Sequence, residues 1–167
     1  KSGCERGNRH NCQSSKENIM RKTFRGKLAD DQVQRIRLHT NNGLTGYKVV
    51  KFLIMGDRPG QDSYELVCRL TTQEQTATGT IDFDDPLLIG VAYLAGAANS
   101  INYPTSGGVI FDNVTVNQDI FVGAVDVNGT EPTNYYLELE QVKLSKDEAT
   151  VATLKDMRAG PDTNFGP

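Results

Sequence analysis

Three carboxylates close together are the strongest candidates for chemistry in this sequence. Asp82, Asp84 and Asp85 lie within four residues of one another, and oxygen ligands at such spacing can hold calcium. The same pattern, followed by Pro86, is also typical of a turn in which an Asp side chain accepts a backbone hydrogen bond. We expect the turn and keep calcium as the alternative.

Cysteine and histidine could bind a metal in the N-terminal segment. Cys4, His10 and Cys12 are suitable residue types, but a structural zinc site takes four ligands. The other candidates, His39 and Cys68, are far away in the sequence. We therefore expect a polar tail with free thiols, with a Cys4–Cys12 disulfide as the alternative. Cys68 lies in a strand-like apolar run, and we expect it to be buried.

Motifs for catalysis are missing from the sequence. There is no Gly-x-Ser-x-Gly and no P-loop, and Gly107-Gly108 is too short to surround a phosphate. The chain has no Trp to build a sugar-stacking platform. No apolar run approaches the length of about 18 residues that a membrane span needs. We expect no enzyme activity, no cofactor, no resident metal and no membrane partner.

The charge is divided unevenly along the chain. Residues 1–28 hold eight Lys or Arg and two acidic residues, which leaves ten basic and nineteen acidic residues for the remainder. A basic, polar segment before an acidic body predicts an extended N-terminal arm that docks on an acidic surface. The residues expected to dock are Arg21, Lys22, Phe24, Arg25 and Lys27.

Residues 1–19 differ in composition from the remainder of the chain. They contain almost no apolar residue, whereas an ordered strand pattern begins soon after Met20. We expect Met20 to be the natural start, with 1–19 an upstream extension; a propeptide cleaved before Lys1 is the alternative.

Alternation of apolar and polar residues predicts strands through the body. Asn42-Gly43 predicts a hairpin between the strands 33–39 and 47–55, because these residue types tolerate positive φ. In the second of these strands Val50, Phe52 and Ile54 are expected to share one face. Residues 71–80 could be an edge strand or a loop, and 87–98 a buried strand or a helix. The other strands are expected at 63–70, 81–83, 109–111, 120–127 and 134–144.

The end of the last strand and the C-terminus carry two further features. The apolar parity of 134–144 changes at Gln141, which predicts a β-bulge or a change of environment. Ser145 and Glu148 form a capping box that predicts a helix over 145–159. Val151, Leu154 and Met157 give this helix a narrow apolar stripe.

Together these elements predict a mainly β fold. About eight short strands without βαβ alternation indicate an antiparallel β-sandwich or jelly-roll-like body at 29–160, with a short C-terminal helix. The N-terminal arm would occupy 1–28 and a polar tail 161–167.

Four stretches resemble a known group of proteins: VQRIRLHTNNGLTGYKVVKFLIM, GTIDFDDPLLIG, VIFDNVTVNQDIFV and NYYLELEQVKLSKDEATVATLKDMR. They are similar to small virion proteins encoded by tailed bacteriophages of marine bacteria, and the likeness covers 20–159. The resemblance implies a structural virion protein, either a capsid decoration protein or a minor capsid subunit. It implies no site residues.

Three functions are therefore considered. The first is a virion subunit that assembles with itself and with other capsid proteins, without an expected small-molecule substrate. The second is a carbohydrate- or ligand-binding β-sandwich module, linked to calcium through Asp82, Asp84 and Asp85. The third is a single-stranded nucleic-acid binder that uses the basic arm.

Overall fold

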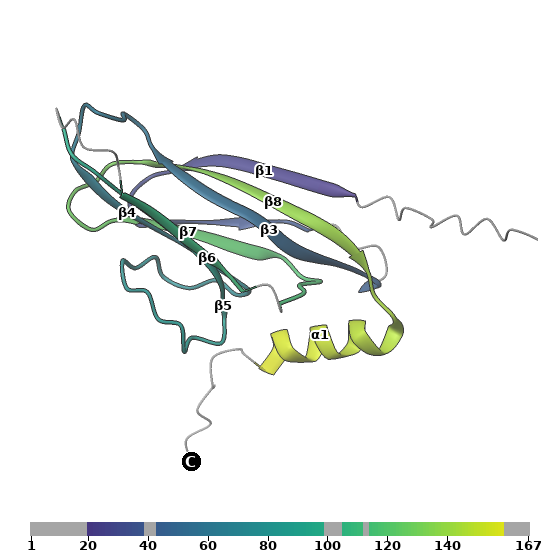
Figure 1. Ribbon diagram of the computed structural model, residues 1–167. Helices are drawn as coiled ribbons and strands as arrows, with labels where there is room; N and C mark the ends of the chain where they lie inside the picture. Colours follow the sequence, from purple (N-terminus) through teal and green to yellow (C-terminus); the bar gives the residue numbers. More distant parts are fainter. Residues whose placement is uncertain (1–19, 39–42, 99–104, 112–113, 159–167) are drawn as a thin grey trace, which may run out of the picture.

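The described residues form two antiparallel sheets and one helix (Figure 1). The computed structural model describes residues 20–38, 43–98, 105–111 and 114–158. Sheet A has the strand order β1-β8-β3 and sheet B the order β2-β7-β4-β5-β6. The elements, in chain order, are β1 (Arg21–Leu28), β2 (Gln32–Ile36), β3 (Thr45–Gly56), β4 (Tyr64–Thr71), β5 (Leu88–Gly96), β6 (Thr105–Ile110), β7 (Ile120–Asp126), β8 (Thr133–Lys143) and α1 (Lys146–Arg158).

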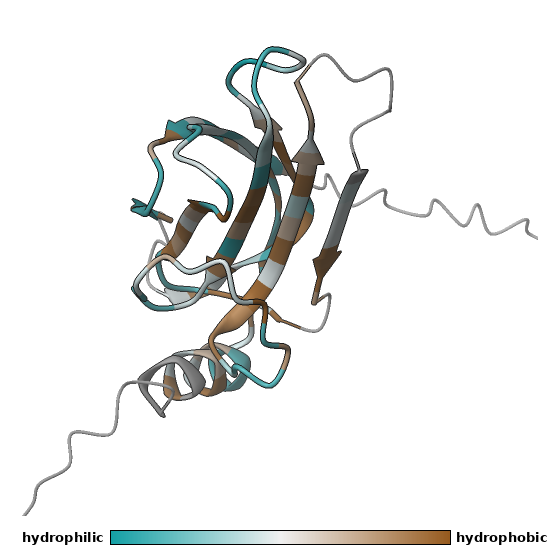
Figure 2. Cartoon of the chain, turned by 90° about the vertical axis from the view of Figure 1, so that its left-hand side faces the viewer, coloured by the Kyte–Doolittle hydropathy of each residue, from teal (hydrophilic) through white to brown (hydrophobic). Residues whose placement is uncertain are grey.

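The core lies between the two sheets. Strand β8 shows why: Tyr135, Leu137 and Leu139 are almost fully buried, whereas Tyr136 between them is 36% exposed. The same alternation in β7 buries Ile120, Val122 and Ala124. Burying a side chain such as Leu137 contributes on the order of 2 kcal/mol. The mainly β fold and its antiparallel sheets are thus as predicted, and hydrophobic residues lie mainly along the strands (Figure 2).

The expected hairpin between residues 33–39 and 47–55 is wrong. Strand β2 pairs with β7 in sheet B, and β3 pairs with β8 in sheet A. Gly43 does take a positive φ of 70°, so the turn residue was correctly recognised. The backbone N–H of Leu38 bonds to Asp119, which precedes β7. This contact holds the end of β2 at sheet B, and the chain then crosses to the other sheet.

The β-bulge expected at Gln141 of β8 is found in the neighbouring strand β3 instead. Pairing along β8 is continuous from Thr133 to Lys143, and the register shifts in β3 between Val49 and Lys51. Val50 is therefore the extra residue, and it is exposed, unlike Phe52. The prediction that Val50 shares a face with Phe52 and Ile54 is corrected for this reason, because a bulge inverts the side-chain alternation.

The structure decides between the alternatives for residues 87–98 and 71–80. Residues 87–98 contain the strand β5, which lies between β4 and β6 in sheet B. The polar residues 72–87 form a loop between β4 and β5. The strand expected at 81–83 is therefore wrong, because these residues belong to this loop. This loop is closed at its base, where the Thr72 N–H bonds to the Leu87 carbonyl at 2.9 Å.

Helix α1 begins at the predicted capping box and lies at one end of the sandwich (Figure 1). The Ser145 N–H bonds to Glu148 at 2.8 Å, and the Glu148 N–H bonds to Ser145 Oγ at 3.3 Å. Asn117, which is buried, donates to Thr153 Oγ1 and to the Ala149 carbonyl. None of the described helices has the length and apolar character of a membrane span.

The apolar stripe expected on α1 does not face the core. Val151 is 51% exposed and Leu154 is 45% exposed, whereas Ala149 is buried. The helix packs through a small residue and the Asn117 hydrogen bonds, so Val151 and Leu154 remain on the surface, and the side chain of Met157 lies outside the described part of the chain.

Candidate functional site

The residues expected to dock lie in a strand of the sandwich. Arg21, Lys22, Phe24, Arg25 and Lys27 all belong to β1, which pairs with β8 from Arg21↔Glu140 to Leu28↔Thr133. The boundary that placed residues 1–28 in one arm is therefore corrected: 21–28 form an edge strand, and 1–19 lie outside the described residues. Exposed side chains alternate with half-buried ones in β1, and the high content of basic residues concealed this strand pattern.

Strand alternation separates these five residues into two groups. Phe24 packs against the core, and Lys22 lies on the same side, where its Nζ donates to the Tyr47 hydroxyl at 2.8 Å. Lys22 also lies over the Tyr47 ring, 5.1 Å from its centroid. Arg21, Arg25 and Lys27 point to the outer face of sheet A and are exposed.

Two of the three outward basic residues have acidic partners. Arg21 contacts Glu138 at 2.7 Å, and Lys27 contacts Asp57 at 2.7 Å. The Lys27 hydrogen bond lowers the pKa of Asp57 below its ordinary value. Among the described residues, no acidic side chain pairs with Arg25. Arg25 is therefore the outward cation of β1 that is available to another molecule.

Large apolar side chains surround Arg25 on the outer face of sheet A. Arg25, Tyr136 and Leu53 lie opposite one another across β1, β8 and β3. Leu53 is 50% exposed and Met55 is 61% exposed. Lys51 extends over the Tyr136 ring, with its Nζ 6.0 Å from the centroid. We call this surface the outer platform: Arg25, Lys51, Leu53, Met55 and Tyr136.

The outer platform forms one wall of a groove. This groove has a volume of about 1140 Å³ and reaches from β1, β8 and β3 to β5 and β6. Its lining also includes Ser106, Gly107 and Gly108 of β6. Among the described strands, β6 pairs only with β5 and β3 only with β8, apart from an isolated bridge between Tyr47 and Val116. The groove therefore reaches the edge strands β3 and β6 of the two sheets.

The groove carries charge of one sign. Among the described residues that line the groove, the charged ones are Arg25 and Lys51, and both are basic. The remaining lining is apolar, aromatic or uncharged polar, and it includes Pro59, Ser106 and Asn134. Such a surface can bind an apolar group that carries negative charge.

The sequence contained a signal for the outer platform that the charge pattern obscured. In the run Phe52–Met55 both alternating positions are apolar, whereas a half-buried strand should carry polar residues on its outer face. Leu53 and Met55 were the exceptions that marked an apolar outer surface. Their neighbour Tyr136 could not be assigned to the same surface without the register between β3 and β8.

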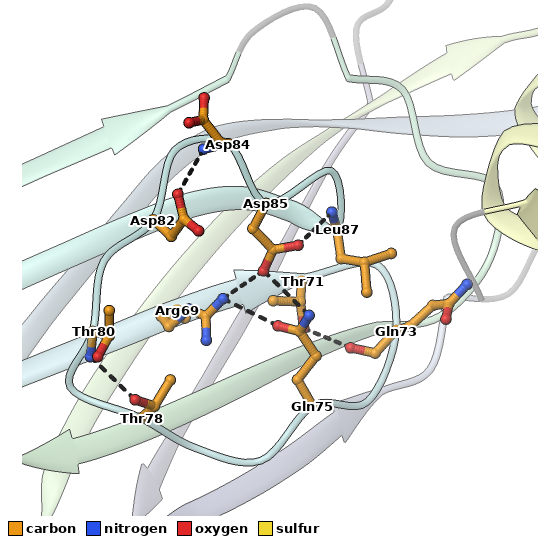
Figure 3. Close-up of polar contacts among 10 residues, drawn as sticks. All are labelled: Arg69, Thr71, Gln73, Gln75, Thr78, Thr80, Asp82, Asp84, Asp85 and Leu87. Carbon is orange, nitrogen blue, oxygen red and sulfur yellow. Dashed lines mark hydrogen bonds and ion pairs between the residues drawn. The ribbon is translucent and has the colours of Figure 1, made fainter. Parts of the chain in front are cut away.

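Two of the three neighbouring carboxylates, Asp82 and Asp85, form turns, as expected (Figure 3). Asp82 Oδ1 accepts the Asp84 N–H at 2.9 Å, and Asp85 Oδ1 accepts the Leu87 N–H at 2.9 Å. Asp85 Oδ2 also contacts Arg69 at 2.6 Å. Both oxygens of Asp85 are thus engaged, and no group of three or more metal-ligating side chains occurs in the described part of the chain.

The other candidate ligands do not meet in one site. Cys68 is buried, as predicted, and burial raises its pKa to about 12, so its thiol is neutral and unreactive. Cys4, His10, Cys12 and His39 lie outside the described residues.

Comparisons with known proteins assign no family. No protein-family model, curated protein or solved structure matches this chain. The function is therefore argued from the groove and from the topology around it.

Proposed function

We propose that this protein is a non-enzymatic structural subunit of a virus particle that assembles with copies of itself and with capsid proteins, as a decoration or minor capsid protein. The observation that carries the proposal is the outer platform. It places two half-exposed aliphatic side chains, Leu53 and Met55, beside Tyr136 and two basic residues on the outer face of sheet A. Exposed apolar patches with a polar rim are typical of protein–protein contacts.

The topology supports the same proposal. The pairs β1–β8, β2–β7 and β4–β5 are nested in one another along the chain, as in a hairpin rolled into a barrel. We propose that this is a variant of the jelly roll in which β6 stays on β5 instead of pairing with β3. Jelly rolls occur in viral capsid and lectin domains, so this support is an analogy at the level of the fold.

Self-assembly can be tested on the purified chain. We expect light scattering after size exclusion to show an oligomer whose population rises with concentration. Changing Leu53→Ser and Met55→Ser together should shift it to monomer without lowering the melting temperature, because both side chains are exposed. A strict monomer at all concentrations would contradict the proposal.

A carbohydrate- or ligand-binding module is the second candidate, and the groove is the observation that favours it. Its volume is slightly above the usual range of small-molecule sites, and Tyr136 offers a half-exposed ring. Titration of isotope-labelled protein with a panel of sugars would show shifted Tyr136 resonances if this candidate were correct. Calcium added to the same sample should leave Asp82 and Asp84 unaffected, because Asp85 is bound to Arg69.

A further inference from the structure

The loop between β4 and β5 carries an apolar and acidic tip. Ile81 is 42% exposed and Phe83 is 56% exposed, although Phe83 also contacts Phe111 edge-on at 5.5 Å between ring centroids. Asp82 and Asp84 flank Phe83 and are exposed. We call residues 81–84 the loop tip.

The loop tip is held firmly in place from below. Arg69 and Asp85, which are 11% and 14% exposed, form the ion pair at the base of the tip. Gln75 donates to Asp85 and accepts from Arg69. Asp84 itself accepts no hydrogen bond from the described residues, and its carboxylate points away from this network (Figure 3). The tip therefore presents its charge and its aromatic ring in an ordered loop.

The loop tip and the groove carry opposite charge, and both expose apolar side chains. Residues 72–87 contain four acidic residues and no Lys or Arg, whereas the charged residues of the described groove lining are basic. The tip offers an aromatic ring between two carboxylates, and the groove offers an apolar wall between two cations. Complementary charge around an aromatic anchor is the usual arrangement of a binding hot spot.

We propose that the groove is occupied by the loop tip of a second copy of this chain, with Phe83 against the outer platform and Asp82 and Asp84 beside Arg25 and Lys51. The inference rests on the proposed self-assembly and names the two surfaces that meet. Because the two surfaces are different, a closed assembly is either a dimer in which each loop tip enters the partner's groove or a ring of several copies.

The first test removes the aromatic ring of Phe83, which is the proposed anchor of the contact. Phe83→Ala should raise the dissociation constant of self-association, measured by sedimentation velocity, at least tenfold, because aromatic anchors dominate such contacts. Lys146→Glu on α1, an exposed charge reversal outside both surfaces, is the matched control and should leave the constant unchanged. Melting temperatures of both variants establish that they are folded.

Charge exchange is the second test. Arg25→Glu and Asp84→Lys should each weaken association about fivefold or more, since neither side chain forms an ion pair with another described residue that would be lost. Both changes in one chain should restore association to within about twofold of the original. Rescue would identify the two surfaces as partners, because a structural effect of either change would persist.

The outcomes separate this inference from the proposed function. If the original chain associates but Phe83→Ala and both charge reversals leave the constant unchanged, the contact is wrong and self-assembly stands. If the double variant associates no better than the weaker single variant, the charges do not meet. If the original chain is a monomer at every concentration, both proposals are overturned.

Discussion

The outer faces of the two sheets differ in what covers them. On sheet B, the β4–β5 loop lies over the neighbouring strand β7: Ala77 lies 3.7 Å from a Cβ position at Gly123, and Gly79 lies against Val125 and Val127. The outward-facing Val67 of β4, which pairs with Val125, is only 3% exposed. On sheet A no described segment covers the outer platform, and Leu53 remains 50% exposed.

This difference shows that the two sheets do not expose their outer faces equally. A loop of sixteen residues suffices to cover one face, whereas the other face is open and exposes Leu53 and Met55 among charged residues. In a soluble monomer the outward positions of Leu53 and Met55 would be expected to carry polar residues. This contrast is the physical reason for proposing that the outer platform binds a partner.

The largest expected effect concerns the ion pair that holds the covering loop. Asp85→Ala should lower the free energy of unfolding by about 3 kcal/mol, because it leaves the largely buried Arg69 without its carboxylate. Urea denaturation measures the change, and Asp84→Ala, an exposed neighbour, should cost less than about 0.5 kcal/mol. A similar small loss for both variants would mean that the loop is not held by this pair.

A matched pair of valines compares the two faces directly. Val67→Ala on the covered face should cost about 2 kcal/mol, since the removed methyl groups are buried. Val50→Ala on the open face should cost less than about 0.5 kcal/mol, because that side chain is 39% exposed. Thermal unfolding of both variants provides the measurement, and equal costs would remove the distinction between the faces.

The smallest expected effect concerns an ion pair on the open face. Arg21→Ala removes the contact with Glu138, but the Arg21 side chain is 53% exposed. We expect the free energy of unfolding to fall by less than about 0.5 kcal/mol. High salt should screen the ion pair in the original chain and so remove this difference. Chemical denaturation at low and high salt tests this, and a loss approaching that of Asp85→Ala would show that the open face is as tightly organised as the covered one.

The sequence by itself determined the local elements. Alternation placed Tyr135, Leu137 and Leu139 on one face, and the Ser145–Glu148 capping box located the start of α1, because both depend on neighbours a few residues apart. The turn chemistry of Asp82 and Asp85 was local in the same way. The resemblance to phage virion proteins remains a prediction.

Only the tertiary structure decided which strands pair and which surfaces result. The Asn42-Gly43 turn suggested a hairpin, yet β2 and β3 belong to different sheets. The bulge at Val50 and the placement of β1 at an edge depend on pairing with β8, more than a hundred residues away from β1. Arg25, Leu53 and Tyr136 are distant in sequence and adjacent in space because sheet register brings them together, and no local pattern encodes that register.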